Sequence, residues 1–126
     1  MTTGPARRRD LKRAFKERQK PAGVFQIKNT VSGKVLLGSS LNLDGTSNIH
    51  RFMLSNGTHY NATMQKDWKQ HGADAFVFEI LEVVKVTQEP SFNLDDELAL
   101  LEAIWIEKLS PFGDRGYNTS TQIRHA

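Results

Sequence analysis

Two short apolar runs that flank a glycine-bearing turn, GVFQIKN and KVLLGSS, constrain the fold of this chain more than any other segment. In the first run Phe25 and Ile27 alternate with polar residues, which is the period-two pattern of a half-buried strand. Residues 29–33 between the runs are turn formers, and Gly33 is free to take a positive φ. The pattern therefore predicts an antiparallel hairpin over residues 23–40.

The rest of the chain mixes helical and strand periodicity. Apolar residues recur at helical spacing in three stretches, each with Gly or Pro at or just after its end. Thr46 or Ser47 is the expected N-cap of the first stretch and Asn93 that of the last. One further run, FVFEILEVV, alternates like a strand. The predicted elements are a helix from Thr46 or Ser47 to Leu54, a helix over 61–71, a strand over 76–84 and a helix over 93–109.

Length and composition favour one folded domain. The chain has 126 residues, 38% of them hydrophobic, which is enough for a single core. It has no cysteine, which excludes disulfides, a thiol nucleophile and a cysteine-ligated metal. No apolar run approaches the ~18 residues of a membrane span, and the charged N-terminal residues lack the apolar core of a signal peptide. We therefore expect a cytoplasmic protein with no membrane partner.

The positive charge is confined to one end of the chain. Residues 1–20 carry eight basic and two acidic side chains, a net charge of +6, whereas residues 21–126 carry nine basic and twelve acidic side chains, a net charge of −3. We expect a basic N-terminal segment (1–20), helical over 6–19, ahead of the domain (21–126). Such a segment suits a polyanion, above all nucleic acid, although a solubilising tail has the same composition. Its basic residues are Arg7, Arg8, Arg9, Lys12, Arg13, Lys16, Arg18 and Lys20.

One carboxylate falls inside the apolar face of the last predicted helix. Glu102 lies one turn from Leu98, Trp105 and Ile106. A carboxylate among buried groups is costly unless it is paired, hydrogen-bonded or metal-bound. The alternative is that Glu102 sits at the border of the stripe and reaches solvent.

An ordered series of motifs resembles the GIY-YIG nuclease superfamily, and most closely its phage-type homing endonucleases. The series is GVF, LLGSS, a histidine on the next helix, a Gly-x-His turn, an FEILE strand, a Glu-x-x-Trp-Ile helix and a closing GYN. It covers residues 23 to about 118. The resemblance implies an α+β fold, a small three-stranded antiparallel sheet flanked by helices.

The resemblance also implies an active site, of which only part is retained. His50, Glu102 as the metal ligand and Asn118 match the family pattern, as do His59 and Trp105. They have a structural alternative: His50 would pack against the hairpin, Glu102 would pair with a cation and Asn118 would fix the closing turn.

Three other positions depart from the family pattern. Phe25 and Leu36 stand where the family has tyrosine hydroxyls, and Thr46 stands where it has an arginine. Arg51 is a poor substitute, because five residues turn it about 140° around the helix from Thr46. Arg115 or an arginine of the N-terminal segment is a better candidate.

These losses predict a degenerate active site. A general base contributes ~10²–10⁴-fold to a rate, and an arginine on a transferring phosphoryl group contributes ~10³–10⁵-fold. We therefore expect a nucleic-acid-binding protein, with DNA as the expected partner, whose endonuclease activity is weak or lost. Two alternatives stay open: an active endonuclease with a rewired site that uses Mg²⁺ or Mn²⁺, and a protein-interaction module that needs no cofactor.

Overall fold

The computed structural model describes residues 21–119. The helix predicted over 6–19, and with it the basic N-terminal segment, lies outside the described residues. No helix between residues 21 and 119 is long and apolar enough to cross a membrane.

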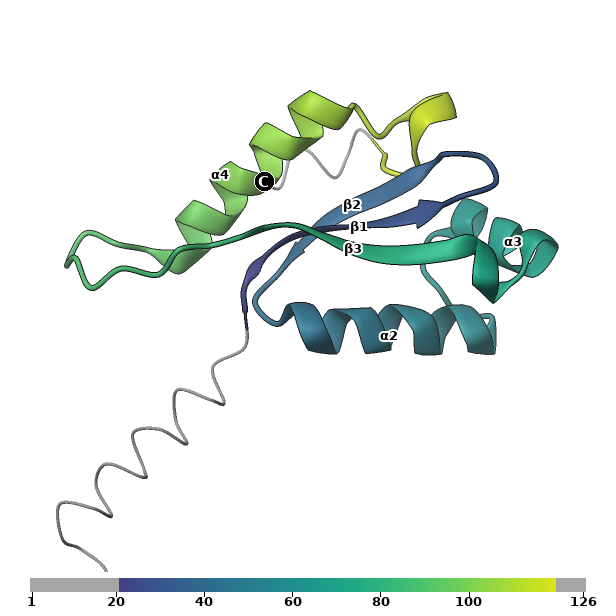
Figure 1. Cartoon of the computed structure of the whole chain (residues 1–126), viewed down its shortest axis with the longest axis horizontal. Helices are drawn as coiled ribbons and strands as arrows, with labels where there is room; N and C mark the ends of the chain where they lie inside the picture. Colours follow the sequence, from purple (N-terminus) through teal and green to yellow (C-terminus); the bar gives the residue numbers. More distant parts are fainter. Residues whose placement is uncertain (1–20, 120–126) are drawn as a thin grey trace, which may run out of the picture.

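The centre of the molecule is a three-stranded antiparallel sheet of order β2-β1-β3 (Figure 1). The predicted hairpin is confirmed, with Phe25 opposite Gly38 and with Gly33 at a φ of 82° in the turn. The α+β prediction is confirmed as well. The strands are β1 (Gly23–Asn29), β2 (Val35–Ser40) and β3 (Phe76–Val83), and the helices are α2 (Leu43–Asn56), α3 (Ala62–His71) and α4 (Leu94–Leu109), with 3-10 turns η1 (Ala73–Ala75) and η2 (Gly113–Arg115).

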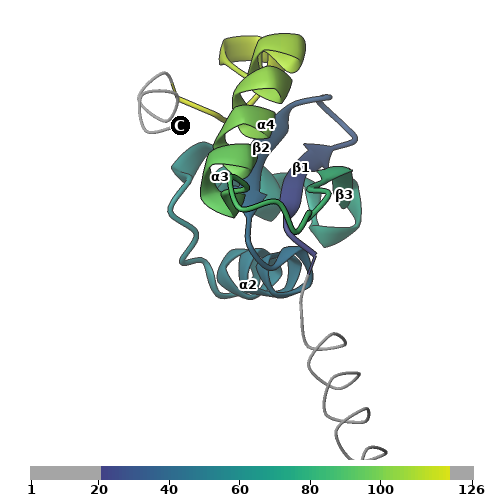
Figure 2. The ribbon, with the colours of Figure 1, turned by 90° about the vertical axis from the view of Figure 1, so that its left-hand side faces the viewer.

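Helices α2 and α4 lie on opposite faces of this sheet (Figures 1 and 2). Alternation along the hairpin divides its side chains between two cores. Toward α2 and α3, Phe25 and Leu36 pack with Leu54 of α2. Toward α4, Val24 and Leu37 pack with Ile106. Each face of the hairpin is thus fixed to a different helix.

Helix termini follow local capping signals. The side chains of Asn61 and Asn93 accept hydrogen bonds from the first turns of α3 and α4, which confirms the predicted cap at Asn93. The predicted start of α2 is wrong, because the helix begins at Leu43 rather than after Thr46. The Asn42 side chain accepts a hydrogen bond from the Gly45 backbone N–H at 3.0 Å, so Gly45 lies in the first turn instead of breaking the helix.

The segment Gly116–Asn118 covers the outer edge of β2. The Tyr117 backbone N–H donates to the Val35 carbonyl at 2.9 Å, next to a parallel bridge between Val35 and Gly116. The Tyr117 hydroxyl accepts a hydrogen bond from Asn29 and donates one to Asp67, at 3.1 and 2.8 Å. The hairpin, α3 and the end of the described chain are thereby joined.

Candidate functional site

A cleft of about 540 Å³ lies where β2, α2, α4 and the segment after η2 meet. It reaches both faces of the sheet at the β2 edge, since α2 and α4 each contribute side chains to it. Five of the residues that the sequence singles out line this cleft, namely Phe25, Thr46, His50, Glu102 and Asn118. Leu36, His59, Trp105 and the two candidate arginines of the described chain do not. The lining residues are Phe25, Leu37, Gly38, Ser39, Thr46, Ile49, His50, Met53, Tyr60, Glu102 and Asn118.

The Glu102 carboxylate is half-buried at the α4 side of the cleft. Ser39 points to the α4 face of β2, and its hydroxyl donates to Glu102 Oε1 at 2.9 Å. Glu102 therefore neither sits fully in solvent nor is buried without a partner. The hydrogen bond orients one carboxylate oxygen toward Ser39.

His50 and His59 form a buried, hydrogen-bonded histidine pair. Nδ1 of His50 lies 2.8 Å from Nε2 of His59. The Asn61 backbone N–H donates to His59 Nδ1 at 3.0 Å, so neutral His59 carries its proton on Nε2 and donates it to His50. Neutral His50 therefore carries its own proton on Nε2, where it is a donor.

Burial keeps both histidines neutral. It lowers the pKa of His50 below 6.5. Burial, together with the proximity of His50, lowers the pKa of His59 to about 4. At neutral pH the pair is therefore an uncharged hydrogen-bonding unit.

Asn118 clamps the backbone of β2. Its Oδ1 accepts a hydrogen bond from the Leu37 N–H, and its Nδ2 donates one to the Leu37 carbonyl, both at 2.8 Å. Both ends of the amide are thus engaged with the strand. The structural alternative for Asn118 is that it fixes the closing turn, whereas its side chain bonds to strand β2 and lines the cleft wall.

The three positions that depart from the family pattern offer the cleft little polar chemistry. The Phe25 ring packs against His50 and Phe78, with centroids 5.5 and 5.1 Å away. Leu36 is 2% exposed and belongs to the core on the α2 face. The Thr46 hydroxyl forms a short hydrogen bond with the Ser40 hydroxyl.

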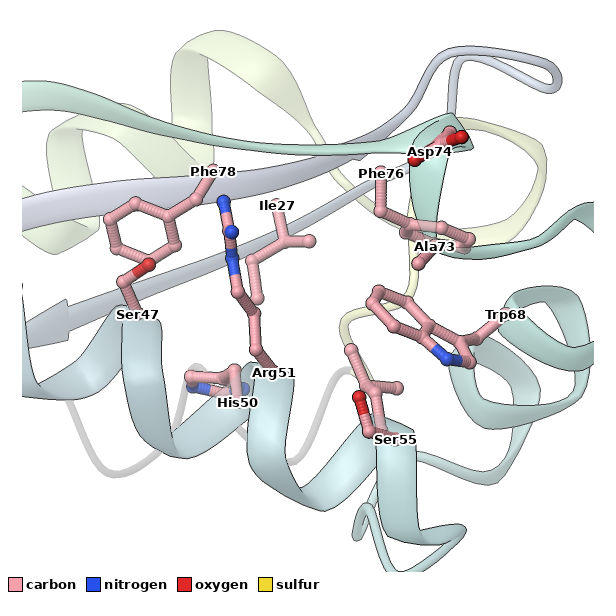
Figure 3. Close-up of a pocket in the computed structure, with 11 residues that line it drawn as sticks. Ile27, Ser47, His50, Arg51, Ser55, Trp68, Ala73, Asp74, Phe76 and Phe78 are labelled. Carbon is pink, nitrogen blue, oxygen red and sulfur yellow. The ribbon is translucent and has the colours of Figure 1, made fainter.

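Neither candidate arginine of the described chain lies in the cleft. Arg51 extends from the far flank of α2 toward the sheet, beside Phe78 and Ile27, in a second cavity of about 370 Å³ (Figure 3). The prediction that Arg51 points elsewhere is confirmed. Arg115 lines a third cavity with Gln26, because η2 directs it to that side of the closing segment. The structure therefore does not bring Arg115 together with the predicted site residues.

Tyr60 is a cleft residue that the sequence reasoning missed. It directly follows His59, which matches the family, but no periodicity or spacing marks it as part of a site. Its ring stacks on His59 at a centroid distance of 4.4 Å. Desolvation, and then the negative charge of Glu102, raise the pKa of the Tyr60 hydroxyl.

Within residues 21–119 no cluster of three or more His, Asp or Glu side chains could hold a metal ion. Among the residues that the structure describes, Glu102 is the one that supplies the cleft with a carboxylate. Mg²⁺ is commonly held by one or two carboxylates, with waters and substrate phosphate completing its shell. The donor set fits a magnesium-type ion that a bound phosphate helps to hold, and it does not fit a resident ion.

The sheet, the flanking helices and this cleft define an endonuclease-like α+β domain. The catalytic domain of the homing endonuclease I-TevI superposes with a TM-score of 0.62 at 30% identity, over 79% of this chain and 98% of that domain. A mutant of the same domain gives 0.63 at 28% identity, over 78% and 92%. The chain belongs to the GIY-YIG nuclease superfamily.

The match to one curated relative covers most of this chain but about a third of the relative. Intron-associated endonuclease 1 of Enterobacteria phage T4 is 30% identical over 97 residues, which are 77% of this chain. The match spans 36% of that endonuclease. No family model matches the chain.

Proposed function

We propose that this protein binds nucleic acid, with DNA as the preferred partner, through its cleft and its basic N-terminal segment, and that its nuclease activity is weak or lost. The observation that carries the proposal is the composition of an open cleft. Glu102 and His50 line it, but no described arginine does, and positions 25 and 36 bear no hydroxyl. The cleft keeps room for a phosphodiester while lacking the groups that would speed its hydrolysis.

The distribution of charge supports binding through both parts. Residues 21–126 are net negative, so they alone would repel a polyanion at long range, whereas residues 1–20 carry +6. We propose that the segment supplies most of the affinity and that the cleft receives one backbone phosphate.

The missing groups set the scale of the lost activity. Absence of the arginine alone removes ~10³–10⁵-fold, and absence of a general base removes ~10²–10⁴-fold. A Mg²⁺ or Mn²⁺ ion held by Glu102 would stabilise negative charge on the phosphate. The uncharged histidine pair would donate from His50 Nε2, which suits a contact with a phosphate oxygen better than removal of a proton from water.

Cleavage of supercoiled plasmid and of branched DNA with Mg²⁺ or Mn²⁺ tests the catalytic half of the proposal. We expect slow cleavage or none. The cleavage rates of wild type and Glu102→Gln should differ by a small factor at most. Rapid cleavage that Glu102→Gln abolishes would refute weak or lost activity, and would establish the rewired endonuclease.

Fluorescence anisotropy with labelled duplex DNA tests the binding half. If the segment makes ~6 phosphate contacts, affinity should fall about 10³-fold between ~50 and ~200 mM salt. A full-length variant with the eight basic residues of 1–20 replaced by glutamine should lose most of the affinity and of the salt dependence. Unchanged affinity would refute the role of the segment, and absence of any DNA binding would favour a protein-interaction module.

A further inference from the structure

Three hydroxyl-bearing residues line the cleft, and two of them, Ser39 and Thr46, are hydrogen-bonded to protein partners. Ser39 donates to Glu102. Ser40 and Thr46 bond to each other. The hydroxyl of Tyr60 differs, because no residue of the described chain hydrogen-bonds it.

The chain has two tyrosines, and the other one is not available to the cleft. The Tyr117 hydroxyl is held between Asn29 and Asp67, and Tyr117 is 4% exposed. Tyr60 is 63% exposed and lines the cleft. Among residues 21–119 it is therefore the phenol that a molecule in the cleft could reach.

The histidine pair fixes the ring of Tyr60. The ring stacks on His59 at 4.4 Å and meets His50 edge-on at 6.0 Å. His59 is itself held by the Asn61 backbone N–H and by His50. A ring supported in this way loses little further freedom when its hydroxyl binds a ligand.

The surroundings of Tyr60 keep its hydroxyl protonated. Desolvation and the Glu102 carboxylate both raise its pKa above the usual 10.0. A protonated phenol donates hydrogen bonds, and a phosphodiester oxygen is a charged acceptor, which makes such a bond stronger than a neutral one.

We infer that the Tyr60 hydroxyl donates a hydrogen bond to a nucleic-acid phosphodiester bound in the cleft. The loop before α3 would thus supply the phenol that the hairpin lacks at Phe25 and Leu36. This inference rests on the proposed function, since it requires a phosphodiester in the cleft.

Binding of a fluorescein-labelled DNA duplex to full-length Tyr60→Phe tests the inference. This substitution removes only the hydroxyl, and the exposed ring should leave folding unchanged, which circular dichroism verifies. We expect affinity about 10-fold lower, the effect of losing one hydrogen bond to a charged group. Thr58→Val, which removes an exposed hydroxyl two residues away and outside the cleft, should bind like wild type. Equal binding by Tyr60→Phe and wild type overturns the inference and leaves the proposed function intact, whereas no binding by wild type overturns the proposed function.

A spectroscopic readout does not depend on affinity. Protein that carries 3-fluorotyrosine has two fluorine signals, and the Tyr60 signal is the one absent from Tyr60→Phe. Saturation with the DNA duplex should shift the Tyr60 signal and leave that of Tyr117 in place. DNA that binds without moving the Tyr60 signal places the phosphodiester away from this hydroxyl and overturns the inference.

Discussion

The two buried hydrogen bonds that the Asn118 side chain makes to β2 should contribute measurably to the stability of this fold. Asn118→Ala deletes both hydrogen bonds to Leu37, each 2.8 Å long and between buried groups. A buried hydrogen bond contributes ~1 kcal/mol net, and a buried backbone group left unpaired costs ~1–3 kcal/mol. We expect the free energy of unfolding to fall by about 3 kcal/mol, which lowers the Tm by roughly 10 °C. Asn118→Asp keeps the volume and one acceptor but turns a carboxylate oxygen toward the Leu37 carbonyl, so it should be no more stable than Asn118→Ala.

Urea denaturation followed by circular dichroism measures this loss. Asn48→Ala is the matched control, because Asn48 is exposed on α2 and its side chain makes no hydrogen bond within the described chain. That control should change stability by less than ~0.5 kcal/mol. If Asn118→Ala is as stable as the control, the clamp on β2 contributes nothing and the reasoning fails.

Three further outcomes follow from the site. Because the folded pKa of His59 is depressed from 6.5 to about 4, the stability it contributes is complete above pH 6.5 and is lost as the pH falls toward 4. The free energy of unfolding, measured by urea titration, should drop by up to about 3 kcal/mol over that range. The His59→Gln variant should show a flatter dependence on pH. A wild-type stability that does not change with pH would contradict a neutral, buried His59. Gly38→Ala places a Cβ 2.8 Å from Cζ of Phe25, so it should lower the free energy of unfolding by ~1–3 kcal/mol, measured by thermal denaturation. A second substitution, Phe25→Leu, should restore the lost stability. A Tm equal to that of wild type would refute the clash. Thr46→Arg should raise DNA affinity about 10-fold by a charge-assisted contact in the cleft, and equal gains from Asn48→Arg would attribute the effect to net charge alone.

Local signals in the sequence account for most of the secondary structure. Asn61 and Asn93 were predictable as helix starts because their side chains cap backbone groups three residues away. The start of α2 was not, since Asn42 caps a turn that contains Gly45, a residue that usually weakens a helix. The sequence alone supports the hairpin, whereas the expectation of a three-stranded antiparallel sheet rested on the family resemblance.

The site was predictable only as a set of residues. Ser39 and Glu102 are 63 residues apart, and Leu37 and Asn118 are 81 apart, so no periodicity could show that they meet. The partner of Glu102 and the clamp of Asn118 therefore emerge only from tertiary packing. Tyr60 was missed because its importance depends on the histidine pair that supports it and on hydroxyls elsewhere being engaged.

The segment that closes the edge of β2 also imposes an order of events during synthesis. The ribosome makes Asn118 81 residues after Leu37, a delay of ~4–16 s at ~5–20 residues per second. Throughout this interval the outer edge of β2 lacks the segment that covers it, and an unpaired strand edge is the kind of surface that joins to other chains. A nascent chain that stalls before Asn118 has an open β2 edge and an incomplete cleft, so the same late step covers this edge and completes the cleft wall.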